Sequence, residues 1–235
     1  MKTFATLLCA AALLSPAALT AASFEGKVTM TMTAAKGAPT PINFSVKPGF
    51  SRMDMQADGH TATIIFDLTK EEMMILMAEQ KMYMTRAMPK PKADSTPDSG
   101  KPSDAVVEKT GVTEKILGYT CTKYISKDKD TTTEMWVTDE LGTFIGMSNG
   151  AAMGGRRGGG APKQAWEEAL QGKDSFPLRV VTTSNKDKSG KETFRMEATA
   201  IDKQKLPASL FAAPEDFQKL DLGGMMRGMI PGFGK

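Results

Sequence analysis

Histidine and cysteine are scarce in this sequence. Its 235 residues contain one histidine, His60, and two cysteines, Cys9 and Cys121. A single histidine excludes most zinc sites and most reactions that need a histidine base. The sequence also lacks a phosphate-binding glycine motif and an ordered set of metal ligands. We therefore predict a non-catalytic protein with no cofactor and no dedicated metal site.

Long apolar runs are also scarce, and the longest lies at the N-terminus. Lys2 precedes an uncharged run over residues 4–19, and small residues follow at positions 20–22. This order is typical of a secretory signal peptide, and the run is shorter than the roughly 20 apolar residues of a spanning helix. We predict a signal peptide over residues 1–22, cleavage after Ala22, and a bacterial protein that is periplasmic or secreted and not an integral membrane protein.

The cysteines and the charge exclude further classes. Cys9 lies inside the apolar run and not at its end, which argues against lipid attachment. Cleavage leaves only Cys121, so no internal disulfide can form. With no histidine nearby in the sequence to activate it, we interpret Cys121 as a small buried hydrophobe. The net charge is only +3, and both signs are interspersed, so we predict no nucleic-acid partner.

Alternation of apolar and polar residues with a period of two dominates the rest of the chain. It is clear over residues 24–32, 42–46 and 53–55, and again in a final hairpin over residues 176–201. Short alternating segments joined by turn residues, such as Lys47-Pro48-Gly49, predict a meander of antiparallel hairpins with one face on a core. The fold class is therefore mainly β, a single antiparallel sheet with one or two short helices packed on it.

Two biased segments interrupt this pattern. One, rich in Pro, Lys, Asp and Ser, covers about residues 88–105, and a Gly-rich segment covers about residues 146–160. Both compositions predict flexible loops. Leu141, Phe144 and Ile145 suggest a short helix before the second loop, and Pro162 opens another after it. We predict one β-rich domain over residues 23–215, followed by a Met- and Gly-rich C-terminal tail over residues 216–235.

Several segments resemble a known family. The most specific is ILGYTCTKY at residues 116–124, followed by EMWVT at 134–138; others are FEGKV at 24–28, KMYM at 81–84, FPLRVV at 176–181 and LPASLF at 206–211. Together and in order, they resemble the exported bacterial proteins with domain of unknown function 4412. That family is similar to the LolA and LolB group of periplasmic lipoprotein carriers. The resemblance implies a strongly curved sheet, an incomplete barrel, with helices on its concave side and acyl chains bound between them.

Methionine is unusually abundant, and the sequence contains 18 of them. Three pairs, Met30/Met32, Met53/Met55 and Met82/Met84, are spaced at i and i+2, so each pair shares one face of a strand. Flexible, polarisable thioethers suit a surface that adapts to varied apolar partners. With the resemblance, this predicts a binding module for a hydrophobic or lipid-like ligand, such as a lipid or lipoprotein acyl chain. The expected lining residues are Met30, Met32, Phe44, Met53, Met55, Met82 and Met84.

Two alternatives remain open on the sequence. In the first, methionine fills the core of a structural or sensing module of the cell envelope that binds no small ligand. In the second, the protein is a methionine-based Cu(I) buffer, because Cu(I) prefers soft thioether ligands. The copper alternative requires about three methionines that converge and remain accessible to solvent.

Overall fold

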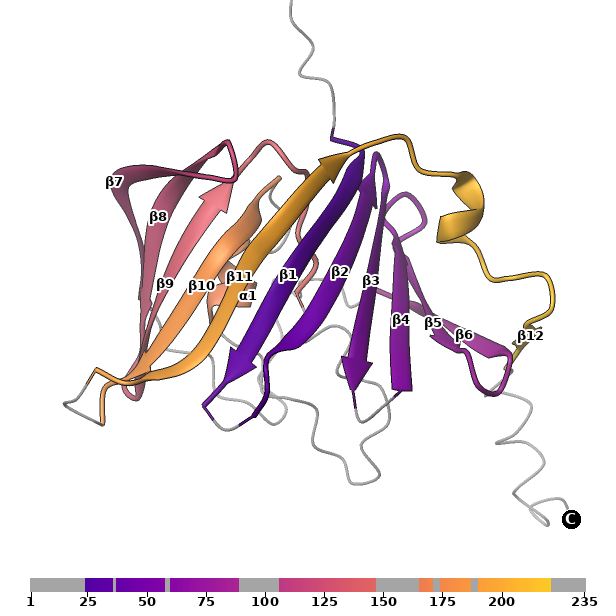
Figure 1. The fold of residues 1–235 in the computed structure, drawn as a ribbon, viewed down its shortest axis with the longest axis horizontal. Helices are drawn as coiled ribbons and strands as arrows, with labels where there is room; N and C mark the ends of the chain where they lie inside the picture. The colour runs from indigo at the N-terminus through magenta and orange to yellow at the C-terminus, as the bar shows by residue number, and fades with distance from the viewer. Residues whose placement is uncertain are drawn as a thin grey trace, which may run out of the picture.

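The computed structural model describes residues 24–35, 37–57, 60–88, 106–146, 165–170, 174–186 and 190–220. Twelve strands in these ranges form one sheet, in the order β12-β6-β5-β4-β3-β2-β1-β11-β10-β9-β8-β7 (Figure 1). The sheet curves strongly and stays open, which confirms the predicted incomplete barrel. The strands are β1 (Gly26–Ala34), β2 (Thr40–Lys47), β3 (Phe50–Ala57), β4 (His60–Asp67), β5 (Glu72–Met77), β6 (Met82–Ala87), β7 (Val106–Ile116), β8 (Tyr119–Lys127), β9 (Thr131–Thr138), β10 (Phe176–Ser184), β11 (Glu192–Lys203) and β12 (Gln218–Lys219).

The sheet consists of two consecutive meanders joined at one seam. Strands β1 to β6 form the first meander and β7 to β11 the second, and every neighbour within them is antiparallel. At the seam, β1 pairs with β11 from Gly26↔Lys203 to Ala34↔Phe194. Tight turns keep the meanders compact: Pro48 and Gly49 join β2 to β3, and Gly49 has a φ of 78°. This combination of proline and left-handed glycine is that of a type II turn.

The concave face carries the main core. Alternation along the strands directs Val28, Phe44 and Ile64 to this face, and each is at most 2% exposed. Residues 141–145 and the six-residue helix α1 (Ala165–Leu170) supply further buried side chains to the same core. A continuous apolar cluster therefore fills the concave side of the strands around the seam.

Residues 141–145 do not form the predicted helix. They have no regular secondary structure, and the Phe144 N–H donates to the carbonyl of Ser175, the residue before β10, at 3.1 Å. The ring of Phe144 lies 5.6 Å from Phe44, 5.4 Å from Phe176 and 6.0 Å from Trp166. The apolar spacing that mimics a helix turn instead reflects side chains that pack onto the sheet from an extended segment.

On the convex face, the described residues after β11 cover the β3–β6 side. After β11 the chain crosses this face and forms a short 3-10 helix, η2 (Ala208–Phe211), at the right of Figure 1. Arg52 donates to the Leu210 carbonyl at 2.9 Å, and Phe211 packs into a second small core with Ile65 and Leu76. Residues 218 and 219, which the sequence assigns to the tail, pair with β6 as the parallel strand β12.

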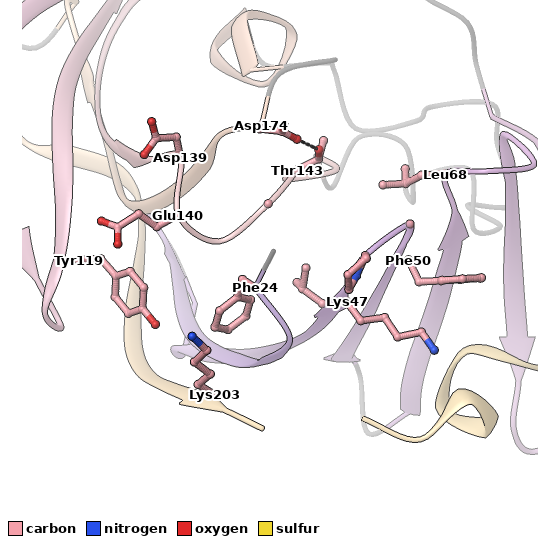
Figure 2. Close-up of a pocket in the computed structure, with 14 residues that line it drawn as sticks. Phe24, Lys47, Phe50, Leu68, Tyr119, Asp139, Glu140, Thr143, Asp174 and Lys203 are labelled. Carbon is pink, nitrogen blue, oxygen red and sulfur yellow. Dashed lines mark hydrogen bonds between the residues drawn. The ribbon is translucent and has the colours of Figure 1, made fainter. Parts of the chain in front are cut away.

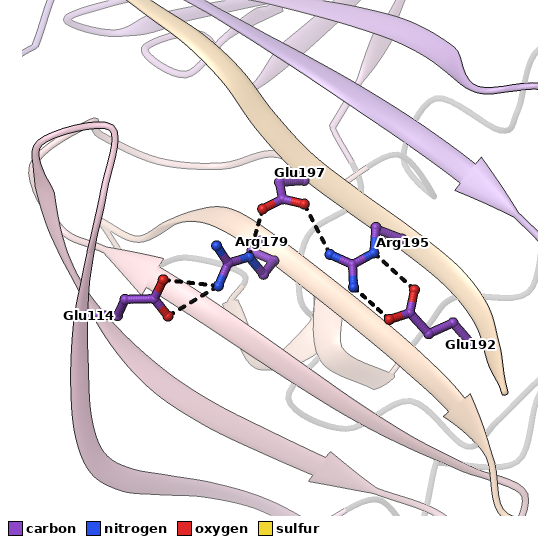
Figure 3. Close-up of polar contacts among 5 residues, drawn as sticks. All are labelled: Glu114, Arg179, Glu192, Arg195 and Glu197. Atoms are coloured by element: carbon purple, nitrogen blue, oxygen red, sulfur yellow. Dashed lines mark hydrogen bonds and ion pairs between the residues drawn. The ribbon is translucent and has the colours of Figure 1, made fainter. Parts of the chain in front are cut away.

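Over β10 and β11 the convex face carries a chain of paired charges (Figure 3). Arg179 lies between Glu197 (2.8 Å) and Glu114 (3.1 Å), and Arg195 lies between Glu197 (3.0 Å) and Glu192. Burial alone would raise the pKa of Glu197, but hydrogen bonds and charges from the two arginines outweigh it and lower this pKa. We interpret these side chains as structural, since each carboxylate has an arginine partner.

No helix in the described ranges is both long and apolar enough to cross a membrane.

Candidate functional site

Three of the predicted ligand-binding residues lie in the core. Met30, Phe44 and Met53 are 0%, 1% and 2% exposed. Phe44 contacts two further aromatic rings, those of Phe144 and Phe176. These side chains therefore form part of the packing of the concave face, which favours the filled-core interpretation for this part of the sheet.

The other predicted methionines lie on the strands as expected but are only half-buried. Met32, Met55 and Met84 pack against the edge of the main core, and Met82 lies beside the β5–β6 turn. The register adds Met77, which the sequence analysis missed and which lies directly opposite Met82. The structure thus separates the predicted set into core residues and a half-buried group on β1, β3 and β6.

A cavity with a volume of about 710 Å³ lies elsewhere, at one end of the curved sheet (Figure 2). Because neighbouring strands are antiparallel, this end collects the ends of β2, β4, β9 and β11 and the beginnings of β1, β3, β8 and β10. We call it the end pocket. Its lining residues are Phe24, Val46, Lys47, Pro48, Gly49, Phe50, Leu68, Tyr119, Asp139, Glu140, Gly142, Thr143, Asp174 and Lys203.

One wall of the end pocket is apolar and belongs to the sheet. Phe24 precedes β1, Val46 ends the buried side of β2, and Phe50 begins β3. Leu68 follows β4 and is held by a hydrogen bond from its N–H to the Gly49 carbonyl at 2.9 Å. The turn between β2 and β3 therefore fixes the position of this wall.

The opposite wall is the segment that follows β9, and hydrogen bonds hold it in place. Thr143 donates to an Asp174 carboxylate oxygen at 2.9 Å, as Figure 2 shows. Glu140 accepts a hydrogen bond from the Thr120 N–H at 3.3 Å. Gly142 has a φ of 80° at the point where this segment passes Val46. The pocket is thus bounded on both sides by anchored backbone.

The polar groups of the end pocket are not all paired. Asp139 and Lys203 have no ion-pair partner among the residues that the structure describes. Burial, together with the charge of Glu140, raises the pKa of Tyr119, so this phenol stays protonated at neutral pH and can donate a hydrogen bond. The pocket therefore offers carboxylates, an ammonium and a phenol near an apolar surface.

Cys121 lies outside this pocket lining. Its thiol is fully buried, and burial raises its pKa to about 11. A thiol of this kind is a poor nucleophile, because the thiolate is the reactive form. The predicted role as a small buried hydrophobe fits this environment. Among the described residues, no group of three or more His, Cys, Asp or Glu could hold a metal ion.

No local pattern in the sequence identifies the end pocket as a unit. Its residues come from eight strand ends and from the segment after β9, and they share no spacing. Only their position next to turns could have suggested it, since the turns of a meander alternate between two edges.

An open, strongly curved antiparallel sheet with a preformed pocket at one end defines a class of half-barrel β proteins. Within it, the chain belongs to the family described as "Domain of unknown function (DUF4412)", whose model matches residues 24–217. This confirms the resemblance found in the sequence. No functionally curated protein matches the chain.

Solved structures with similar folds share little sequence with this chain. An uncharacterized conserved protein from Thermus thermophilus is 12% identical, with a TM-score of 0.47, over 84% of this chain and 90% of that one. PNGF-II is 16% identical, with a TM-score of 0.48, over 88% of this chain but only 33% of its own. The LolA superfamily protein NE2245 from Nitrosomonas europaea is 11% identical, with a TM-score of 0.32, over 82% and 91%.

Proposed function

We propose that this protein is a non-catalytic binding module of the bacterial cell envelope that holds an amphipathic hydrophobic ligand in its end pocket. The observation that carries the proposal is the pocket itself, in which an apolar sheet wall faces a hydrogen-bonded segment, and in which Asp139 and Lys203 have no ion-pair partner in the described part of the chain. The pattern of a signal peptide at residues 1–22 supports a location outside the cytoplasm.

The size and lining of the pocket fit a small amphipathic molecule. Ligand pockets are commonly 300–1,000 Å³, mainly apolar, and carry a few polar groups that orient the ligand; the end pocket has about 710 Å³. Phe24 and Leu68 would contact the apolar part, and Asp139 and Lys203 would contact the polar part. Since anchored backbone forms both walls, little ordering is needed on binding, which favours affinity.

The chemistry of the lining also favours binding over catalysis. Its titratable side chains are carboxylates, lysines and a tyrosine with a raised pKa. None of them forms the nucleophile–base pair that acyl or phosphoryl transfer requires. The proposed role is therefore to hold a molecule and release it unchanged.

Native mass spectrometry of the processed chain, purified without detergent, is the first test. We expect an adduct with the mass of a lipid or another amphiphile. A fluorescent long-chain fatty acid then reports on the pocket. Leu68→Arg places a charge in the apolar wall and should weaken binding of this probe at least tenfold.

Leu117→Arg is the matched control, because Leu117 lies in the β7–β8 turn, is 46% exposed and is not part of the pocket lining. It should bind the probe like the natural chain. A bare mass together with no probe binding would contradict the proposal. It would favour the second candidate, a structural or sensing module, which the complete burial of Met30, Phe44 and Met53 already favours for the central part of the sheet.

A further inference from the structure

One row of directly opposed residues on neighbouring strands crosses six strands on the concave face and is rich in methionine. We call it the register row. The strand pairings connect its members one after another, from Met30 on β1 to Met82 on β6. Directly opposed residues of antiparallel strands share a face of the sheet. Since Met30 is in the main core, the whole row faces the concave side. In strand order the row is Met30, Ile42, Met55, Ala62, Met77 and Met82.

Burial divides this row into two parts. Met30 and Ile42 are completely buried, whereas Met55, Met77 and Met82 are half-buried and accessible to solvent. Other methionines of the concave core, such as Met135 and Met196, are also fully buried. The three accessible thioethers therefore gather at one end of the row, and we call them the methionine trio.

The residue that lies between members of the trio is small. Met55 and Met77 both pair with Ala62, so their strands lie about 10 Å apart with only a methyl group between them. Concave curvature tilts side chains on this face toward one another. Met77 and Met82 are opposite neighbours, whose Cβ atoms are about 5 Å apart in such pairs. Met82 lies three strands from Met55, about 14 Å on a flat sheet, and the concave curvature brings these long, flexible side chains closer together.

The end of the hairpin that carries Met77 and Met82 is braced. Lys81 donates from its N–H to the Ala78 carbonyl at 3.2 Å and forms an ion pair with Asp216 at 2.9 Å. The backbone of β12 adds a hydrogen bond from the Gln218 N–H to the Lys81 carbonyl at 2.8 Å. These contacts fix two of the three methionines relative to each other.

We propose that Met55, Met77 and Met82 form a Cu(I) site. Thioethers are soft ligands that select Cu(I) over harder ions such as Mg²⁺ and Ca²⁺, which prefer oxygen. Three converging, solvent-accessible methionines are what the sequence-based copper hypothesis requires. However, the register assembles them across β3, β5 and β6, while Met53, the i, i+2 partner of Met55, is buried in the core. The site lies away from the end pocket and shares no residue with it.

The test is an anaerobic competition of the processed chain with the Cu(I) chelator bicinchoninate, with X-ray absorption of the loaded protein. We expect one Cu(I) per chain with sulfur as the main ligand. Leucine keeps the volume and apolar character of methionine, so the variants should fold. Met77→Leu should weaken Cu(I) binding at least tenfold, and the triple Leu variant of the trio should abolish it.

Met74→Leu is the matched control, because Met74 is also a half-buried methionine of β5 but packs with the convex core. It should retain full Cu(I) affinity. Retention of Cu(I) by the folded triple variant, or oxygen and nitrogen as the main ligands, would overturn the proposal. Leu68→Arg should leave Cu(I) binding unchanged, and the triple variant should still bind the fatty-acid probe, so failure of one proposal is distinguishable from failure of the other.

Discussion

The two ends of one register row show how the same apolar pattern becomes core in one place and surface in another. Met30 and Ile42, near the seam, are completely buried, whereas Met55, Met77 and Met82 on the outer strands are half-buried. The main core around the seam receives additional side chains from residues 141–145 and α1. What distinguishes the two ends is therefore the cover that distant parts of the chain supply, and not the strands themselves.

The largest expected effect comes from removing one of the side chains that residues 141–145 add to the main core. Phe144→Ala deletes a ring that is 2% exposed and contacts three other rings. We expect the free energy of unfolding to fall by about 3–5 kcal/mol, as for other buried Phe→Ala changes. Urea unfolding of the processed chain measures it. Met77→Ala at the other end of the row should cost only about 1 kcal/mol, and equal losses would refute the distinction.

A smaller effect concerns the reactivity of Cys121, which is buried on β8. Burial raises the pKa of the Cys121 thiol to about 11, from a usual value of 9.0. At pH 8 the thiolate population is then about 100-fold lower, so reaction with a disulfide reagent should be slower by at least this factor than in urea-unfolded protein. Stopped-flow absorbance measures the two rates. Fast labelling in the folded state would show that this half opens readily.

The smallest expected effect concerns the convex face. The pKa of Glu197 is lowered in the folded state, so its contribution to stability is present above the unfolded pKa near 4.5 and disappears as the pH falls through the folded pKa. Glu197→Gln should therefore reduce stability at pH 7 by at most about 1 kcal/mol, because the pair is partly exposed. The difference should vanish in acid.

Thermal unfolding between pH 3 and pH 7 checks this pH dependence. Glu108→Gln is the control, since Glu108 is exposed on β7 and has no ion pair in the described part of the chain. A Glu197→Gln difference that grows as the pH falls would contradict the sign.

The sequence predicts the strands well because alternation is a local property. It assigns Val28, Phe44 and Met53 correctly to the buried face, and the final hairpin has nearly the predicted bounds. The depth of burial is not local. Met53 and Met55 have the same pattern in the sequence, yet Met53 is buried and Met55 remains accessible to solvent.

Failures of the sequence-based interpretation have similar causes. Leu141, Phe144 and Ile145 have helical spacing, but Gly142 takes a left-handed conformation and Phe144 bonds to the start of β10. Pairing across the sheet identifies Met77 as a partner of Met82, and no spacing along the chain could do so. The end pocket combines residues from eight strand ends, so only the topology reveals it.

The seam between β1 and β11 has a consequence for the order in which the protein can fold. The first meander, β1 to β6, is complete once residue 87 has been synthesised. However, β1 has only β2 as a neighbour until β11, more than 150 residues later in the chain, pairs with it. Contacts of such long sequence separation slow folding. Until β11 arrives, the edge of β1 and the apolar side of six strands remain exposed, so a nascent chain is most prone to aggregation at that stage.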